Sequence, residues 1–177
     1  MPKHSHAPAG GSAAFPAPEH NHGPCLDTAI ERARLAFEAK GLRLTDLRRE
    51  VFEEIAGSHH AVGAYDVLDR LARKGHRLAP ISVYRAIDAL LDAGVIHRLE
   101  SRNAFFACHA SHAPDRDQVF LVCERCGRVA EIAGDAIFAA MASAIRAAAF
   151  AARRTVVEVA GLCVDCRSGV VAGSTGG

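Results

Sequence analysis

Residues 95–108 read VIHRLESRNAFFAC, and this stretch decides the fold. Two apolar runs, at 95–100 and 104–108, flank the short polar segment Ser101-Arg102-Asn103. Apolar runs separated by turn-forming residues are typical of a two-stranded hairpin. Helical patterns fill the sequence before this stretch, so the hairpin is predicted to be the wing of a winged helix.

Four amphipathic segments precede the hairpin, each with apolar residues at helical spacing and with capping residues or glycines near its ends. Thr28 and Glu31 have the spacing of a capping box at the start of the first helix. Pro80 is expected to interrupt regular structure just before the fourth helix, which Ser82 would cap. The predicted helices cover about residues 27–40, 46–56, 64–74 and 82–91.

The pattern after the hairpin mixes strands with one Ala-rich helix. Strands are predicted at 118–122, 128–132 and 154–160, and the helix from Asp135 to about Ala152. This order indicates an α+β protein. We expect a His- and Pro-rich disordered tail over residues 1–25 and a winged-helix domain over residues 26–106. An α/β domain is expected over residues 107–168, followed by a frayed end over residues 169–177.

Composition excludes several classes of protein. The chain has 177 residues, half of them apolar, with 21 basic and 20 acidic side chains and a net charge of +1. That balance argues against binding nucleic acid by bulk charge. No apolar run is long enough to span a membrane, and no apolar leader follows Met1. We therefore expect a cytoplasmic protein without a membrane partner, in which the six cysteines are metal ligands or reactive thiols.

Four of the cysteines form two C-x-x-C pairs, Cys123 with Cys126 and Cys163 with Cys166. Each pair can present two thiolates from a tight turn, and two pairs complete the tetrahedral sulfur set that zinc accepts. The alternative is a thioredoxin-like redox pair, which is disfavoured because two pairs are present and neither clearly opens a helix. The sequence therefore predicts a structural zinc held by all four cysteines.

A second set of ligand types lies on both sides of the predicted domain boundary: His97, Cys108, His109, His112 and Glu131. A metal held from both sides would tie the two domains together, and its occupancy would set the angle between them. Imidazole, thiolate and carboxylate together suit zinc. The alternative is that the histidine is an ordinary half-exposed side chain and that Cys108 belongs to the core.

The first turn of the fourth predicted helix carries Ser82, Tyr84 and Arg85. Such side chains enter the major groove in a winged helix, where an arginine can bind guanine and a tyrosine a thymine methyl or a phosphate. Simple packing and a solvated helix face are the alternatives. Candidate phosphate contacts are Arg98 and Arg102 on the wing, and Arg43, Arg48, Arg49 and Arg77.

Taken together, the sequence resembles the ferric uptake regulator family, and within it the zinc uptake regulator branch, from about Leu26 to Arg167. The motifs that carry the resemblance are Leu44-Thr45-x-x-Arg48, Ala64-Tyr65-Asp66-x-Leu68, Ser82-Val83-Tyr84-Arg85-Ala86, Val95-x-His97-x-Leu99-Glu100-Ser101-x-Asn103, Cys123-x-x-Cys126-Gly127 and Gly161-Leu162-Cys163-x-x-Cys166. The resemblance implies a homodimeric, metal-dependent transcriptional repressor and not an enzyme. Its expected parts are an N-terminal winged-helix DNA-binding domain and a C-terminal α/β dimerisation domain with a four-cysteine zinc site.

The resemblance also implies roles for single residues. Tyr65, Ser82, Tyr84 and Arg85 would contact double-stranded DNA. Two zinc ions per chain are implied: the structural one on Cys123, Cys126, Cys163 and Cys166, and a regulatory one on His97, Cys108, Glu131 and a loop histidine. The family position of that histidine holds Arg116 here, so we assign His112, with His109, Asp115 and Asp117 as alternatives.

The sequence is also compatible with rival functions. An iron- or peroxide-responsive regulator of the same family is one, although clustered histidines before the first C-x-x-C are sparse and Cys108 favours zinc. A zinc deaminase is another, but the chain lacks H-x-E and no proline precedes either cysteine pair. A zinc-binding interaction module, supplied with metal by the His-rich tail, is the third.

Overall fold

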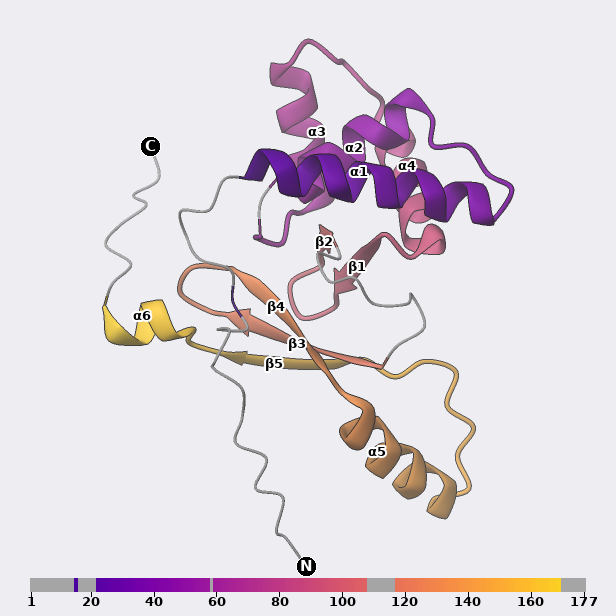
Figure 1. Ribbon diagram of the computed structural model, residues 1–177, viewed down its shortest axis with the longest axis vertical. Coiled ribbons are helices and arrows are strands. Elements are labelled where there is room, and N and C mark those ends of the chain that lie inside the picture. The colour runs from indigo at the N-terminus through magenta and orange to yellow at the C-terminus, as the bar shows by residue number, and fades with distance from the viewer. Residues whose placement is uncertain (1–14, 16–21, 58, 108–116, 170–177) are drawn as a thin grey trace, which may run out of the picture.

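The computed structural model describes residue 15 and residues 22–57, 59–107 and 117–169. Four helices come first, and a hairpin, a three-stranded sheet and two further helices follow (Figure 1). The helices are α1 (His22–Ala39), α2 (Asp46–Ala56), α3 (Ala64–Arg73), α4 (Pro80–Ala93), α5 (Asp135–Ala147) and α6 (Val164–Ser168). The strands are β1 (Ile96–Leu99), β2 (Ala104–Ala107), β3 (Gln118–Cys123), β4 (Val129–Ala133) and β5 (Val157–Gly161).

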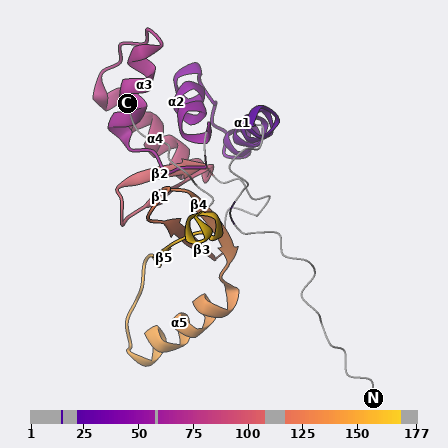
Figure 2. The same cartoon turned by 90° about the vertical axis from the view of Figure 1, so that its left-hand side faces the viewer.

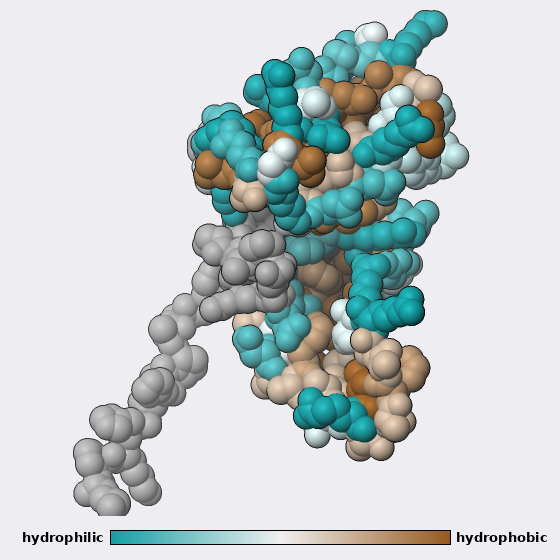
Figure 3. Space-filling model, turned by 90° about the vertical axis from the view of Figure 1, so that its right-hand side faces the viewer, coloured by the Kyte–Doolittle hydropathy of each residue, from teal (hydrophilic) through white to brown (hydrophobic). Residues whose placement is uncertain are grey.

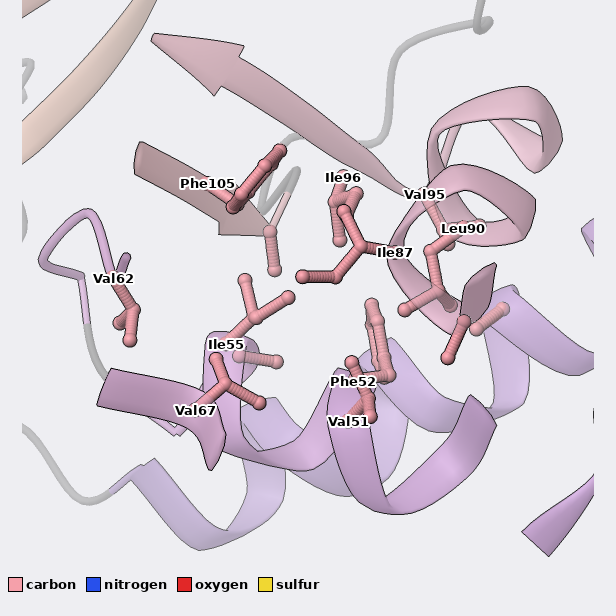
Figure 4. Packing of buried hydrophobic residues seen from close by; sticks show 14 of the residues in the cluster. Val51, Phe52, Ile55, Val62, Val67, Ile87, Leu90, Val95, Ile96 and Phe105 are labelled. Atoms are coloured by element: carbon pink, nitrogen blue, oxygen red, sulfur yellow. The ribbon is translucent and has the colours of Figure 1, made fainter. Parts of the chain in front are cut away.

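The four N-terminal helices and the hairpin share one apolar core, which confirms the winged helix. Phe52 and Ile55 of α2 meet Ile87 and Leu90 of α4 beneath Phe105 of the hairpin (Figure 4). All five side chains are buried. Burial of this apolar surface is the main favourable contribution to the folding of this half.

Two predicted helix starts were wrong. Helix α1 begins at His22, so Thr28 and Glu31 lie inside it and form no capping box. Pro80 occupies the first position of α4, where the missing N–H costs nothing because no carbonyl precedes it in the helix. Ser82 therefore lies in the first turn of α4 and is not its cap. The predicted start of α2 is confirmed, since Thr45 is its N-cap.

The hairpin packs on both of its faces. Ile96 and Phe105 point into the helical core, whereas Leu99 and Phe106 join Phe120 of β3 in a second apolar cluster. Side chains alternate between the two faces of a strand, so one short hairpin can serve both halves. The boundary between residues 106 and 107 stays a prediction, because the hairpin belongs to both sides.

The sheet has the order β4-β3-β5, with β3 antiparallel to β4 and parallel to β5. Helix α5 extends from the end of β4 and stands away from the sheet (Figure 2), and none of its residues is buried. It ends at Ala147, earlier than the predicted Ala152. Among the described residues, no helix is both long and apolar enough to cross a membrane.

A short connector between α2 and α3, residues 59–62, joins the two halves. The N–H of Val129 in β4 donates to the carbonyl of His59 at 3.0 Å. Val62 and Phe105 of β2 exchange two backbone hydrogen bonds, at 2.7 and 2.8 Å. The connector is therefore bonded to the sheet at one end and to the hairpin at the other.

Candidate metal centre and nucleic-acid interface

The four cysteines of the two C-x-x-C pairs come together at one end of the sheet. Their sulfur atoms all lie within 4.8 Å of one another, and Cys126 Sγ lies 3.8 Å from Cys163 Sγ. Zinc–sulfur bonds of about 2.3 Å in a tetrahedron place sulfurs about 3.8 Å apart. Three of the four residues are buried, the exception being Cys126. The donor set and its spacing fit a structural zinc.

The topology of the sheet explains why the two pairs meet. Strand β5 runs parallel to β3, with Gly161 in register with Cys123, so both strands end at the same edge. Cys123 is the last residue of β3, and Cys163 lies two residues after the end of β5. In the first turn Gly127 has φ +72°, a conformation that an L side chain rarely adopts, and this lets the chain fold back. Cys163 caps α6, so the expectation that neither pair opens a helix was wrong.

Hydrogen bonds around the cluster favour thiolate at one position in particular. Burial alone would raise the pKa of Cys123, but backbone N–H groups of Cys126 and Cys163 outweigh it and lower the pKa to about 6. Burial, together with the neighbouring sulfurs, raises the pKa of Cys166 to about 12. Four crowded sulfurs cannot all ionise without a compensating charge, and a divalent cation supplies that charge.

Arg128 lies against this cluster and was not predicted to belong to it. The residue is 4% exposed, and its side chain donates to Cys163 Sγ at 3.2 Å and to Cys126 Sγ at 3.4 Å. It also forms an ion pair with Asp165. A buried guanidinium between two sulfur ligands offsets part of the negative charge that four thiolates carry. Phe15, which falls in the predicted tail, also packs against the cysteine cluster.

His97 occupies the contact between the hairpin and the sheet. Its ring lies 5.4 Å from that of Phe106 and 5.2 Å from that of Phe120, measured between centroids. Its Nε2 atom is buried and has no hydrogen-bond partner among the residues that the structure describes. Burial lowers the pKa of His97 to about 4, so the ring is neutral at pH 7. A neutral imidazole whose buried nitrogen lacks a hydrogen-bond partner is suited to bind a metal ion.

Glu131 of β4 approaches the same face of the sheet as His97. It is paired in register with Phe120, and directly paired residues project to the same face. His97 contacts Phe120 from that face, so the two candidate ligands lie on one side of the sheet. Cys108, His112, His109 and Asp115 fall outside the described residues. Asp117 precedes β3 and lines a hollow beside α5.

The residues expected to contact DNA gather at the start of α3 and of α4. Tyr65 is 71% exposed and Tyr84 is 39% exposed, and their rings meet edge-on with centroids 6.4 Å apart. Arg85 is exposed, and Ser82 is half-buried. The two tyrosines line a hollow of about 340 Å³. An exposed tyrosine pair beside an arginine offers aromatic and cationic contacts to one strand of a duplex.

The wing arginines have partners within the protein. Arg102 is a candidate phosphate contact, and its guanidinium donates to the carbonyl of Cys123 at 3.4 Å. Arg98 donates to the side chain of Asn103 at 2.8 Å. On α2, Arg48 donates to the Arg43 carbonyl at 2.7 Å. The turn of the wing thus faces the four-cysteine cluster.

The chain is similar to known proteins over most of its length. The model of the ferric uptake regulator family matches residues 39–160. The zinc uptake regulation protein of Escherichia coli K12 is 35% identical over 137 residues, which cover 77% of this chain and 80% of that protein. The ferric uptake regulation protein of the same strain is 30% identical over 105 residues, covering 58% of this chain and 68% of that protein.

Solved structures agree with these matches. A zinc uptake regulator complexed with zinc and DNA matches with a TM-score of 0.76 and 32% identity, over 82% of this chain and 97% of the other. Holo XcZur matches with a TM-score of 0.73 and 34% identity, over 80% of this chain and 99% of the other. The family model spans most of the chain, and the match with a zinc uptake regulation protein is longer than that with a ferric one. The chain therefore belongs to the ferric uptake regulator family.

Proposed function

We propose that this protein is a zinc-responsive transcriptional repressor of the cytoplasm. It binds a pseudo-palindromic operator near zinc-uptake genes as a homodimer, and only when zinc is bound at a second, exchangeable site. The chain then holds two zinc ions: one on the four cysteines, which stabilises the sheet, and one on His97, Cys108, His112 and Glu131, which controls DNA binding.

One observation carries this proposal: at the contact between hairpin and sheet, Nε2 of His97 has no partner within the described ranges. Leaving a buried polar atom without a partner costs about 1–3 kcal/mol, and a bound metal ion removes that cost. Glu131 reaches the same face from the sheet. A metal bound there favours the arrangement in which hairpin and sheet are in contact, and this is the differential affinity that a switch requires.

The DNA-binding part rests on the exposed residues of α3 and α4. Tyr65, Tyr84 and Arg85 project from the helical half, where basic and acidic residues nearly balance. Recognition then depends on local placement rather than on bulk charge. In this arrangement Arg85 reads a guanine, and Tyr65 and Tyr84 contact sugar, phosphate or a thymine methyl. Ser82, in the first turn, donates to a backbone phosphate.

The homodimer rests on the surface of α5 and β5. Ile137 of α5 is 43% exposed, Val159 of β5 is 49% exposed and Phe150, which follows α5, is 68% exposed. Apolar residues dominate the lower end of the molecule in Figure 3, where α5 lies. An exposed apolar patch on a mixed sheet and on the helix that protrudes from it is typical of a subunit interface. A two-fold dimer places two recognition helices on successive turns of a pseudo-palindrome.

Selection from a random DNA duplex library, in buffered free zinc and in its absence, tests the proposal without assuming an operator sequence. We expect a pseudo-palindromic sequence to be enriched only with zinc. Binding of that sequence is then measured against free Zn²⁺ and Fe²⁺, which separates zinc sensing from iron sensing. Cys108→Ser should abolish the zinc dependence and keep the four-cysteine zinc, and Cys25→Ser is the matched control.

Three results would contradict the proposal. The first is enrichment that is independent of zinc. The second is activation of DNA binding by Fe²⁺ at a lower free concentration than the free Zn²⁺ concentration needed for the same binding. The third is an unchanged zinc dependence in Cys108→Ser. A fourth arm concerns the tail: deletion of residues 1–14, which keeps Phe15 at the cysteine cluster, should leave zinc sensing unaltered, and loss of sensing would favour a metal-delivering module instead.

A further inference from the structure

The turn of the wing is hydrogen-bonded to the sheet through the carboxylate of Glu158. Glu158 of β5 accepts hydrogen bonds from the backbone N–H groups of Glu100, at 2.6 Å, and Ser101, at 3.1 Å. The bonds join residues 58 and 57 positions apart, so they connect the two halves of the protein. A carboxylate is a stronger acceptor than a carbonyl, and two adjacent donors fix its orientation.

Two further contacts flank this carboxylate. Arg154, just before β5, forms an ion pair with Glu100 at 2.9 Å. On the other side, Arg102 donates to the carbonyl of Cys123. Three consecutive residues of the turn, 100–102, thus contact the sheet or the four-cysteine turn. The exposed ion pair contributes little by itself, so the main attachment is the pair of bonds to Glu158.

We propose that Glu158 is a positioning residue that holds the wing against the sheet and thereby sets the angle between the DNA-contacting helices and the dimer interface. This inference rests on the proposed function. The hairpin is part of the core of the helical half, and β5 carries part of the apolar surface assigned to the dimer. The two backbone bonds to Glu158 therefore fix the orientation of one relative to the other, independently of the ligands around His97.

The ionisation of Glu158 agrees with this role. Burial acts to raise its pKa, but the hydrogen bonds from Ser101 and Glu100 and the charge of Arg154 outweigh burial and lower the pKa below the usual value. The carboxylate is therefore charged at neutral pH. A charged acceptor at this place gives the two exposed turn amides a stronger hydrogen-bond partner than a neutral oxygen would.

Hydrogen exchange of the zinc-loaded full-length chain tests the attachment directly. In Glu158→Ala we expect the amides of the wing turn, residues 100 and 101, to exchange at least about tenfold faster. Glu158→Gln keeps an oxygen acceptor and should give a smaller increase. Glu38→Gln, an exposed substitution on α1, is the matched control and should change nothing. Equal exchange in all four proteins would overturn the proposal.

A second measurement tests the consequence for DNA. With the duplex enriched by selection, Glu158→Ala should bind severalfold more weakly at saturating zinc, with the same midpoint in the zinc titration. Zinc content and circular dichroism establish whether Glu158→Ala is folded. If it does not fold, DNA binding is measured with Glu158→Gln instead. Faster exchange with unchanged DNA affinity would overturn the positioning role. Failure of the wild-type chain to bind any duplex would reject the proposed function and leave the exchange result standing.

Discussion

The four-cysteine cluster and the surroundings of His97 are assembled in opposite ways. The cluster takes all four cysteines from segments that follow two neighbouring strands at one edge of a single sheet, and three of its four residues are buried. The His97 region combines a residue of the hairpin with one of the sheet, and its other proposed ligands lie in the segment between them. A site closed within one unit stabilises that unit, whereas a site divided between two units responds to metal by changing their arrangement.

The largest expected effect is the loss of the cluster. Cys166→Ser removes one of four sulfurs from a buried site. Structural zinc binding in small domains is worth on the order of 10–16 kcal/mol, which matches or exceeds the total stability of a typical domain, about 5–15 kcal/mol. We expect the sheet to lose cooperative unfolding and its tightly held zinc. Native mass spectrometry and urea unfolding measure this, with Cys25→Ser as control; a folded, zinc-loaded variant would remove the contrast between the two sites.

A smaller effect is expected when the sulfurs keep their positions but lose their charge partner. Arg128→Leu removes the hydrogen bonds to Cys126 and Cys163. Loss of such an outer contact costs roughly 10–100-fold in metal affinity. Competition with a chromogenic chelator should show weaker binding, with partial recovery in Arg128→Lys. Arg167→Leu, an exposed position on α6, is the control. Identical affinities in the Leu variant and the wild type would assign Arg128 to packing alone.

At the proposed zinc site around His97, loss of a ligand should raise the free energy of unfolding in the absence of zinc, whereas loss of a cysteine from the cluster should lower it. His97→Phe keeps the ring contacts with Phe106 and Phe120 but removes the buried Nε2. In a mild chelator that spares the cluster, we expect the free energy of unfolding to rise by about 1 kcal/mol. Added zinc should no longer increase stability. Urea unfolding with and without zinc measures both effects, and His76→Leu is the exposed control. A less stable variant in chelator would mean that His97 is a packing residue only.

The smallest expected effect concerns pH. The folded-state pKa of Glu158 lies below its unfolded value, so its contribution to stability is present above the unfolded pKa and is lost as pH falls through the folded pKa. The difference in unfolding free energy between wild type and Glu158→Gln should be constant above about pH 5 and shrink below about pH 4.3. We expect acid release of zinc to affect both proteins alike, because Glu158 is not one of the proposed zinc ligands. A difference that grows on acidification would be inconsistent with a charged Glu158.

Local patterns in the sequence predicted most of the elements. The hairpin, the first C-x-x-C turn and the order of helices and strands as far as β5 are confirmed, because turn residues and apolar periodicity act over short distances. The start of α4 was missed, since Pro80 is compatible both with a break and with a first helical position. Helix α6 is too short to have a periodicity, and its cysteine was assigned to a turn.

The candidate sites were predictable where spacing along the chain carries the information. The four cysteines share such a spacing, and the structure brings them together. The roles of Arg128 and Glu158 depend on contacts across the sheet, from residues 35 and 58 positions away, and no local pattern contains them. Arg102 was named as a candidate phosphate contact from its charge and its place on the wing, and its tertiary hydrogen bond to Cys123 is likewise absent from any local pattern. The assignments of Tyr65, Ser82, Tyr84 and Arg85 stay predictions.

The connector of residues 59–62 has a consequence for how a change in the sheet reaches the helices. It is hydrogen-bonded to β4 through His59 and to β2 through Val62, and α3 begins only two residues later. A sliding of β4 relative to the hairpin therefore pulls on the first turn of α3, where Tyr65 lies. Tyr65 would respond to such sliding through the short backbone segment between His59 and Ala64, without any shift of α2 or α4.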